Sequence, residues 1–282
     1  MGDTTVGQLI EDCAAKLGDI PGARDESREI VAAILDVTKS WPSMNSAKRV
    51  CQRHAKQALD ASVKRATGAP IQYAIGRAPF RHLSLVVDGR VLIPRPETEM
   101  LVDIVLSRVK GGTIADVGTG SGAIALALAT EGAYDRVIAT DISGPALDVA
   151  RDNGARYEAQ GRGVVEFRSG SLLAPLAGET LAALVSNPPY IADAEMDELP
   201  AEVRGWEPEG ALRSGTDGLE ATRAIIAGAP DVLVPGGLLA LEVDSRRAAC
   251  TSDILKADGR YEKIEITADL TGRERFVTAL RR

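Results

Sequence analysis

Apolar residues recur at helical spacing through the first part of the chain, up to about residue 67. In the first segment they fall three or four positions apart until Gly18 and Pro21 interrupt the pattern: Val6, Leu9, Ile10, Cys13, Ala14 and Leu17. The same spacing predicts a second helix around residues 30–35 and a third from about residue 43 to residue 63. Strand-like alternation is not found here, so we expect residues 1–75 to form a small all-helical domain.

Glycine and proline interrupt the chain repeatedly between residues 68 and 96. Within this stretch, two short apolar runs at residues 83–87 and 90–93 flank Asp88-Gly89, a dipeptide typical of tight hairpin turns. We therefore expect residues 76–96 to form a β-hairpin linker.

From residue 97 onward, candidate helices alternate with candidate strands. The helices are predicted at residues 97–109, 121–131, 144–160 and 217–233, with a further one after residue 243. The strands are predicted at residues 113–117, 136–140, 164–168, 181–186, 237–243, 261–266 and 274–280. Such alternation is typical of an α/β fold with a doubly wound, mostly parallel sheet. The last two strands are joined too closely for a helical crossover, so we expect them to be antiparallel to each other.

Composition excludes several classes of protein. The 282 residues are 45% hydrophobic but only 4% aromatic, so the core must consist mainly of aliphatic side chains. Two histidines cannot build a multi-histidine metal site, and three widely separated cysteines form no C-x-x-C pair, so we expect neither a metal nor a disulfide framework. The formal net charge of −7 argues against a protein that binds the nucleic-acid backbone directly. Nothing in the pattern requires an oligomer, so we expect a monomer.

The first residues are acidic and lack the basic start and apolar run of a signal peptide. The longest apolar run, residues 123–129, is far shorter than the ~20 residues of a membrane span. We therefore expect a cytoplasmic protein that does not bind membranes.

A glycine-rich segment, Asp116-Val-Gly-Thr-Gly-Ser-Gly122, follows the first predicted strand of the α/β region and opens a helix. Glycines allow the backbone to approach a cofactor, and a helix N-terminus offers free N–H groups. Asp141 ends the next strand, where a cofactor ribose would present its hydroxyls. The spacing favours S-adenosyl-L-methionine (SAM), although a dinucleotide site and a purely structural turn stay open at this point.

The segment Asn187-Pro-Pro-Tyr190 stands at the carboxyl end of the fourth predicted strand, the sheet edge where ligands bind in open α/β folds. Two prolines fix the backbone and leave their carbonyl groups without internal partners. A planar –NH2 group has two N–H donors, and the Asn187 side-chain oxygen and the Pro188 carbonyl can accept both. Tyr190 offers a flat wall for a planar group. The alternative is a rigid loop without chemistry.

Such a grip suits the methylation of a weak nucleophile. The lone pair of an amide or aniline-type nitrogen is delocalised, and acceptors at both N–H bonds favour electron density on the nitrogen. They also stabilise the positive charge that develops during transfer. Because the methylated nitrogen becomes acidic, a strong base is not required, and Asn187 is expected to orient and polarise the amide.

Together these segments resemble the SAM-dependent amino-group methyltransferases. Three further stretches, at residues 70–80, 92–99 and 269–276, are similar to the release factor glutamine methyltransferases, also called the HemK family. The resemblance implies a helical substrate-recognition domain at residues 1–75 and a Rossmann-like SAM-dependent methyltransferase domain at residues 97–282. That domain would contain a mostly parallel seven-stranded sheet with an antiparallel last strand. The implied substrate is the glutamine of the Gly-Gly-Gln loop in class I peptide chain release factors, and the implied product is N5-methylglutamine.

The resemblance also implies roles for individual residues. A group of five would wrap the methionine part of SAM: Gly118, Thr119, Gly120, Ser121 and Gly122. Asp141 would bind the ribose, with Ser171 and Asn187 as further cofactor contacts. The substrate amide would be held by Asn187, Pro188, Pro189 and Tyr190, and the catalytic residues would be Asn187, Pro188 and Tyr190.

The chain departs from the family pattern at two places. Gly170-Ser171 stand where relatives have an acidic residue and an aromatic residue near the adenine, and Glu242 is not followed by a glycine. Arg95, Glu97 and Glu99 are expected to brace the site entrance or to form structural salt bridges.

Two other functions stay open at this stage. The main alternative is a nucleic-acid adenine-N6 methyltransferase, for which a set of basic residues near the linker is the only support: Lys48, Arg49, Arg53, Lys56, Lys64 and Arg65. A SAM-binding protein without catalysis is the third interpretation. The long segment 191–216 is expected to be a lid or partner surface, with Trp206 packing it down, or else a solvated acidic loop.

Overall fold

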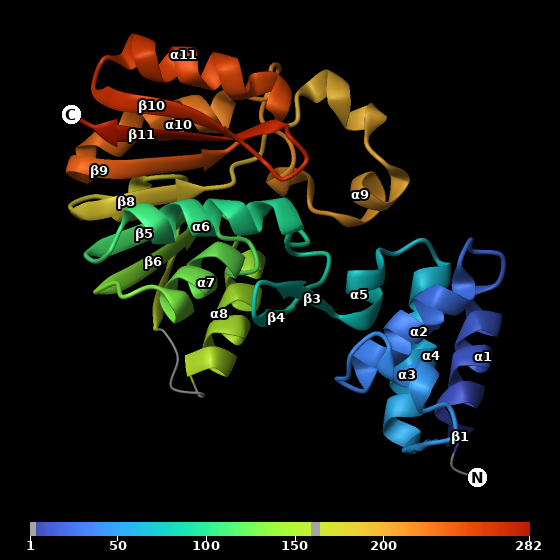
Figure 1. The fold of residues 1–282 in the computed structure, drawn as a ribbon. Helices are drawn as coiled ribbons and strands as arrows, with labels where there is room; N and C mark the ends of the chain where they lie inside the picture. The colour runs from blue at the N-terminus through green and yellow to red at the C-terminus, as the bar shows by residue number, and fades with distance from the viewer. Residues whose placement is uncertain (1–3, 159–163) are drawn as a thin grey trace. The chain divides into compact units, whose positions relative to one another are not determined.

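The chain divides into two compact units (Figure 1). The computed structural model describes residues 4–158 and 164–282. The first unit comprises the chain up to Arg77 together with Ala201–Trp206, and the second comprises Ala78–Pro200 and Glu207–Arg282. In the described parts of the chain, no helix combines the length and the apolar character needed to cross a membrane.

The first unit is mainly helical. Its helices are α1 (Val6–Leu17), α2 (Ala23–Ile34), α3 (Trp41–Met44), α4 (Gln52–Ala66), α5 (Ile71–Ile75) and α9 (Ala201–Trp206). Helix α1 begins where the Thr5 hydroxyl accepts a hydrogen bond from the Gln8 backbone N–H, and it ends at Gly18 with φ of +64°. Five of the six apolar residues that predicted this helix are buried: Val6, Leu9, Ile10, Cys13 and Leu17.

Two predictions for this unit were wrong. The third long helix begins at Gln52 rather than near residue 43, and the unit is not entirely helical, because β1 (Thr4–Thr5) pairs antiparallel with β2 (Arg49–Val50). The free N–H groups at the start of α1 explain both differences. Val6 N–H donates to the Lys48 carbonyl at 2.8 Å, which holds the residues before α4 in an extended conformation. Apolar spacing alone cannot show that a neighbouring segment is required as a hydrogen-bond acceptor.

The second unit contains a seven-stranded sheet with the order β10-β11-β9-β8-β5-β6-β7. The strands are β5 (Thr113–Val117), β6 (Arg136–Asp141), β7 (Val165–Ser169), β8 (Leu181–Ser186), β9 (Leu233–Glu242), β10 (Tyr261–Ala268) and β11 (Glu274–Arg281). Strands β5 to β9 pair in parallel, whereas β11 is antiparallel to both β9 and β10. The predicted α/β class, the mostly parallel sheet and the antiparallel last strand are confirmed.

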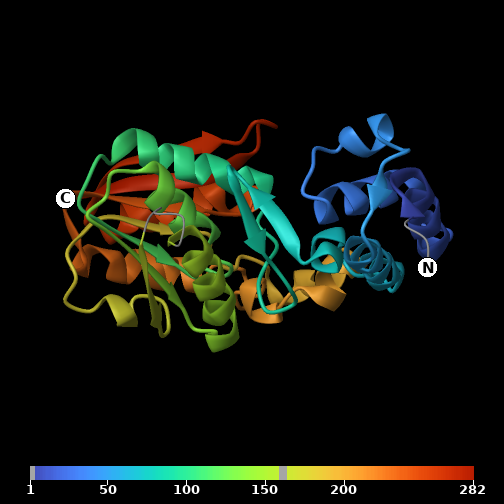
Figure 2. The ribbon, with the colours of Figure 1, turned by 90° about the horizontal axis from the view of Figure 1, so that it is seen from below.

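Helices cover both faces of this sheet (Figure 2). They are α6 (Glu99–Arg108), α7 (Ala123–Glu131), α8 (Gly144–Glu158), α10 (Glu220–Gly228) and α11 (Ala248–Asp258). Alternate residues of β8 belong to different apolar clusters: Leu184 packs with α10 and α11, whereas Val185 packs with α6 and α7. Because both faces are buried, the strands read as continuous apolar runs, as parallel strands do. The helix predicted at 144–160 is confirmed up to residue 158, and its last two residues lie outside the described part.

The hairpin forms one strand earlier than predicted. Strand β3 (Arg77–Phe80) pairs with β4 (Leu83–Val86), and the turn consists of Arg81, whose φ is +54°, and His82. Residues 90–93 do not form a strand, although Val91 and Ile93 are buried. Their alternation reports burial of one side of a loop, which does not require a partner strand.

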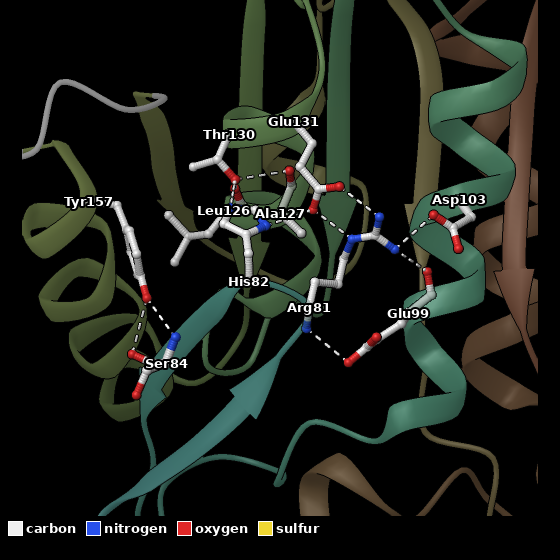
Figure 3. A network of polar contacts seen from close by, with 10 residues as sticks. All are labelled: Arg81, His82, Ser84, Glu99, Asp103, Leu126, Ala127, Thr130, Glu131 and Tyr157. Atoms are coloured by element: carbon white, nitrogen blue, oxygen red, sulfur yellow. Dashed lines mark hydrogen bonds and ion pairs between the residues drawn. The ribbon is translucent and has the colours of Figure 1, made fainter. Parts of the chain in front are cut away.

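Side-chain contacts fix this hairpin to three helices of the second unit (Figure 3). The Arg81 guanidinium binds both carboxylate oxygens of Glu131 on α7 at 2.6 Å and Asp103 on α6 at 2.8 Å. The Arg81 backbone N–H donates to Glu99 at 2.8 Å. On the other side of the turn, the Tyr157 hydroxyl of α8 accepts from the Ser84 N–H at 2.7 Å.

A buried amide connects the hairpin to the glycine-rich segment. Asn153 on α8 accepts from the Val86 N–H at 2.7 Å and donates to the Val86 carbonyl at 3.1 Å and to the Ser121 carbonyl at 2.9 Å. The side chain therefore bridges β4 and the loop that precedes α7. It was not among the residues singled out from the sequence.

We predict that Tyr157→Phe lowers the free energy of unfolding by about 1–2 kcal/mol, because the substitution leaves the Ser84 N–H without its partner. Tyr134→Phe is the matched control, since the Tyr134 hydroxyl is buried without a hydrogen-bond partner among the described residues. Its removal should change stability by less than about 0.5 kcal/mol or increase it. Urea denaturation of the two variants tests this, and equal losses of stability would contradict it.

Candidate active site

The glycine-rich segment forms a loop of left-handed backbone at the carboxyl end of β5. Gly118, Gly120 and Gly122 have φ values of +75°, +55° and +84°, a region that favours glycine. No atom lies within 4 Å of the position that a Cβ would take at Gly118 or Gly120. These two residues therefore present bare backbone to open space, as a close-fitting ligand requires.

Asp116 holds this loop from behind. Its carboxylate accepts from the Thr119 hydroxyl at 2.6 Å and from the Ala125 N–H at 3.2 Å, and the residue is completely buried. Burial raises the pKa of Asp116 to about 7, against the lowering effect of these hydrogen bonds. Its other oxygen, Oδ1, has no partner among the described residues. The side chain of Thr119 is therefore directed at Asp116, and the loop offers its backbone to a ligand.

Asp141 ends β6 beside this loop. One carboxylate oxygen accepts from the Gly120 N–H at 2.9 Å and the other from the Ser143 N–H at 2.8 Å. Each oxygen can accept a second hydrogen bond. The carboxylate thus both orients the loop and keeps acceptors for a hydroxylated ligand.

A cavity of about 350 Å³ lies at this edge of the sheet. Six of the residues predicted from the sequence line it: Gly118, Gly120, Asp141, Ser171, Asn187 and Pro189. Ile142 and Leu172 add apolar walls, and Arg90–Leu92 and Pro208–Ala211 contribute further lining. The other predicted residues do not line it: Thr119, Ser121, Gly122, Pro188 and Tyr190. The volume falls within the range of ~300–1,000 Å³ that is usual for small-molecule sites.

Asn187 follows β8, whose last residue is tied to the neighbouring strand by a hydrogen bond from the Ser186 hydroxyl to the Val117 carbonyl at 2.6 Å. The Asn187 side-chain Nδ2 donates to the Thr98 hydroxyl at 3.3 Å. Because the amide nitrogen is engaged, the acceptor Oδ1 is left for a ligand.

A layer of buried charged groups lies behind the Asn187–Tyr190 segment. Glu242, at the end of β9, is 1% exposed, and burial raises its pKa to about 7, although a hydrogen bond with Thr98 opposes the rise. Burial, together with the Glu242 charge, raises the pKa of Tyr190 to about 12. Arg275 binds Asp269 at 3.0 Å and lies near Glu242.

The predicted bracing residues form ion pairs and hydrogen bonds. Arg95 donates to both carboxylate oxygens of Glu207 at 2.7 and 2.8 Å, and burial raises the pKa of Glu207. Glu99 accepts from the Arg81 N–H. Thr98 stands between these residues and was not singled out from the sequence, because its role depends on side chains that only the fold brings together.

The segment predicted as a lid, residues 191–216, does not behave as one piece. Trp206 belongs to the first unit, where its indole nitrogen lies 3.9 Å from the position of a Cβ on Gly68. The remainder belongs to the second unit and is fixed by ion pairs of Arg247 with Glu195 and of Arg213 with Asp193. The prediction that Trp206 packs the rest of the segment down is therefore not supported.

Comparison with known proteins agrees with this arrangement. The family model described as "Methyltransferase small domain" matches residues 96–202. The release factor glutamine methyltransferase of Moorella thermoacetica is 47% identical over 229 residues, which cover 80% of this chain and 79% of that protein. The protein of the same name from Deinococcus radiodurans is 37% identical over 278 residues, 97% of each chain.

Solved structures show the same fold. A methyltransferase from Pyrococcus furiosus superposes with a TM-score of 0.54 at 19% identity, over 71% of this chain and 89% of that one. The hMettl16 catalytic domain in complex with an RNA hairpin superposes with a TM-score of 0.56 at 18% identity, over 79% and 80%. Because the Deinococcus relative matches almost from end to end, we conclude that the chain belongs to the family of release factor glutamine methyltransferases.

Proposed function

We propose that this protein transfers a methyl group from SAM to the side-chain amide nitrogen of the glutamine in the Gly-Gly-Gln loop of class I peptide chain release factors. The observation that carries the proposal is the position of Asn187, at the same cavity as Gly118 and Asp141. The alternative of adenine-N6 methylation is not favoured, since the relatives that match most of the chain are named glutamine methyltransferases.

The cavity suits SAM, which when bound supplies a methyl group on a positively charged sulfur. Gly118 and Gly120 offer backbone without side chains to its methionine part, with Thr119, Ser121 and Gly122 shaping the loop. Asp141 keeps acceptors for the two ribose hydroxyls. Ser171, Ile142 and Leu172 line the cavity where an adenine would lie. The apolar walls of Ile142 and Leu172 can replace the aromatic residue that the family pattern has there.

Asn187 and Pro188 act on the substrate. The Asn187 Oδ1 and the Pro188 carbonyl accept the two N–H bonds of the glutamine amide, and Pro189 and Tyr190 confine it. These fixed acceptors favour electron density on the nitrogen and stabilise the charge that develops on it. They also align the amide for in-line transfer. The product nitrogen is acidic enough to lose its proton to water.

The first unit recognises the release factor in this proposal, as the predicted domain at residues 1–75. The protein acts as a monomer in the cytoplasm, where release factors work, and it contacts no nucleic acid directly. The hairpin linker at residues 76–96 then serves to build the cavity wall, because Arg90–Leu92 line it.

Replacing Asn187 by alanine should lower kcat by about 100-fold or more, because one of the two fixed acceptors is lost. SAM affinity should change little. The assay is transfer of labelled methyl from SAM to purified release factor, with calorimetry for SAM binding. A release factor whose loop glutamine is replaced is the control substrate, and turnover close to that of the wild type would contradict this account.

Replacing Asp141 by asparagine should raise the Kd for SAM by about 10-fold or more, because hydrogen bonds to a charged acceptor are lost. Asparagine keeps the shape of the side chain and one acceptor. Asp148→Asn, at an exposed position on α8, is the matched control. An unchanged Kd by calorimetry would remove Asp141 from the ribose site.

Deleting residues 1–67 should lower kcat/KM for a whole release factor while leaving the Kd for SAM unchanged. On a short Gly-Gly-Gln peptide, which cannot reach a separate docking surface, the truncated and complete proteins should be equally active. Equal activity on the whole release factor would show that the helical unit does not recognise the substrate.

A further inference from the structure

Three residues from separate parts of the second unit meet beside the proposed amide site. Asn187 follows β8 and Glu242 ends β9, and the two strands pair in parallel with Ser186 opposite Leu241. The next residues along both strands, Asn187 and Glu242, therefore emerge side by side at the same sheet edge. Thr98 precedes α6 and contacts both of them.

We propose that Thr98 is a positioning residue, held by Glu242, that fixes which side of the Asn187 amide faces the substrate. The inference rests on the proposed function. It concerns a hydroxyl that is 4% exposed and does not line the cavity.

The argument depends on the number of hydrogens available. A threonine hydroxyl has one hydrogen to donate and lone pairs to accept with. Glu242 accepts that hydrogen through its side-chain hydrogen bond with Thr98. The Thr98 oxygen can then only accept from Asn187, so the asparagine must turn its –NH2 group toward Thr98, at 3.3 Å.

The orientation matters because the two sides of an asparagine amide have opposite hydrogen-bonding character. With Nδ2 on Thr98, the acceptor Oδ1 is left for the glutamine –NH2. In the reversed orientation, Asn187 would present donors to donors and could not hold the substrate amide. Without Glu242, the Thr98 hydroxyl could donate to Asn187 and stabilise that reversed orientation.

The arrangement also explains a buried carboxyl group with no other evident role. Glu242 is 1% exposed, and its Oε2 has no hydrogen-bond partner within the described residues. Arg275, the nearest cation, is engaged with Asp269. A buried carboxyl with one unsatisfied oxygen is costly, so its position beside Thr98 calls for a function.

The test compares Thr98→Val, Thr98→Ser and wild type for methyl transfer to a release factor. Valine has the shape of threonine but offers no acceptor, so the productive orientation of Asn187 would bury an unpaired N–H. We expect kcat to fall by about 10-fold or more, with KM for the release factor and Kd for SAM within about twofold of the wild type. Serine keeps the hydroxyl and should retain most of the kcat.

Thr222→Val is the matched control, because Thr222 is also fully buried and its hydroxyl has no partner among the described residues. It should leave kcat unchanged. If Thr98→Val fails to fold, Glu242→Met tests the same idea from the other end, since methionine removes the acceptor without adding a donor, and kcat should again fall.

Wild-type kcat in Thr98→Val or in Glu242→Met would overturn the proposal. Equal impairment of the serine and valine variants would do so too, because packing rather than the hydroxyl would then matter. A loss confined to SAM affinity would assign Thr98 to the cofactor cavity instead. An inactive wild-type protein would refute the proposed function and not this inference, so the two failures are distinguishable.

Discussion

The parallel pairing of β5 with both of its neighbours determines where every part of the proposed site lies. Val117 is opposite Thr140 on one side and Ser186 on the other. The residues that follow them, Gly118, Asp141 and Asn187, therefore leave the sheet in one row. Pairing of β8 with β9 extends the row to Glu242. A shift of one residue between any two strands would separate the cofactor loop from the amide site, since both depend on the same register.

Behind this row, the protein buries carboxyl groups that are costly to bury. Asp116 supports the glycine loop and Glu242 contacts Thr98, and each has one oxygen without a partner among the described residues. Both have a raised pKa because of burial. Perturbed groups of this kind cluster at functional sites, where rigid support for a ligand is worth a loss of stability. Here the support consists of short contacts with residues that do not touch the cavity.

Much of this arrangement could be predicted from the sequence. The strands of the second unit are long apolar runs between clear breaks, and the glycine loop and Asn187–Tyr190 consist of residues with few alternative uses. The errors arose where long-range contacts override local pattern. Residues 90–93 alternate like a strand but are a buried loop, and the segment before α4 is drawn into pairing with the start of α1. Thr98 and Asn153 gave no signal, because an ordinary threonine and an ordinary asparagine acquire their partners only in the fold.

Asn153 has a consequence for how such proteins can be recombined. Its single amide satisfies both backbone groups of Val86 and the carbonyl of Ser121, so three distant parts of the second unit share one set of hydrogen bonds. A chimaera that took the hairpin from one relative and α8 from another would have to match the two backbones to within the tolerance of those bonds. Hairpin, glycine loop and α8 should therefore be exchanged as one block, even though more than thirty residues of chain separate Val86 from Ser121 and again Ser121 from Asn153.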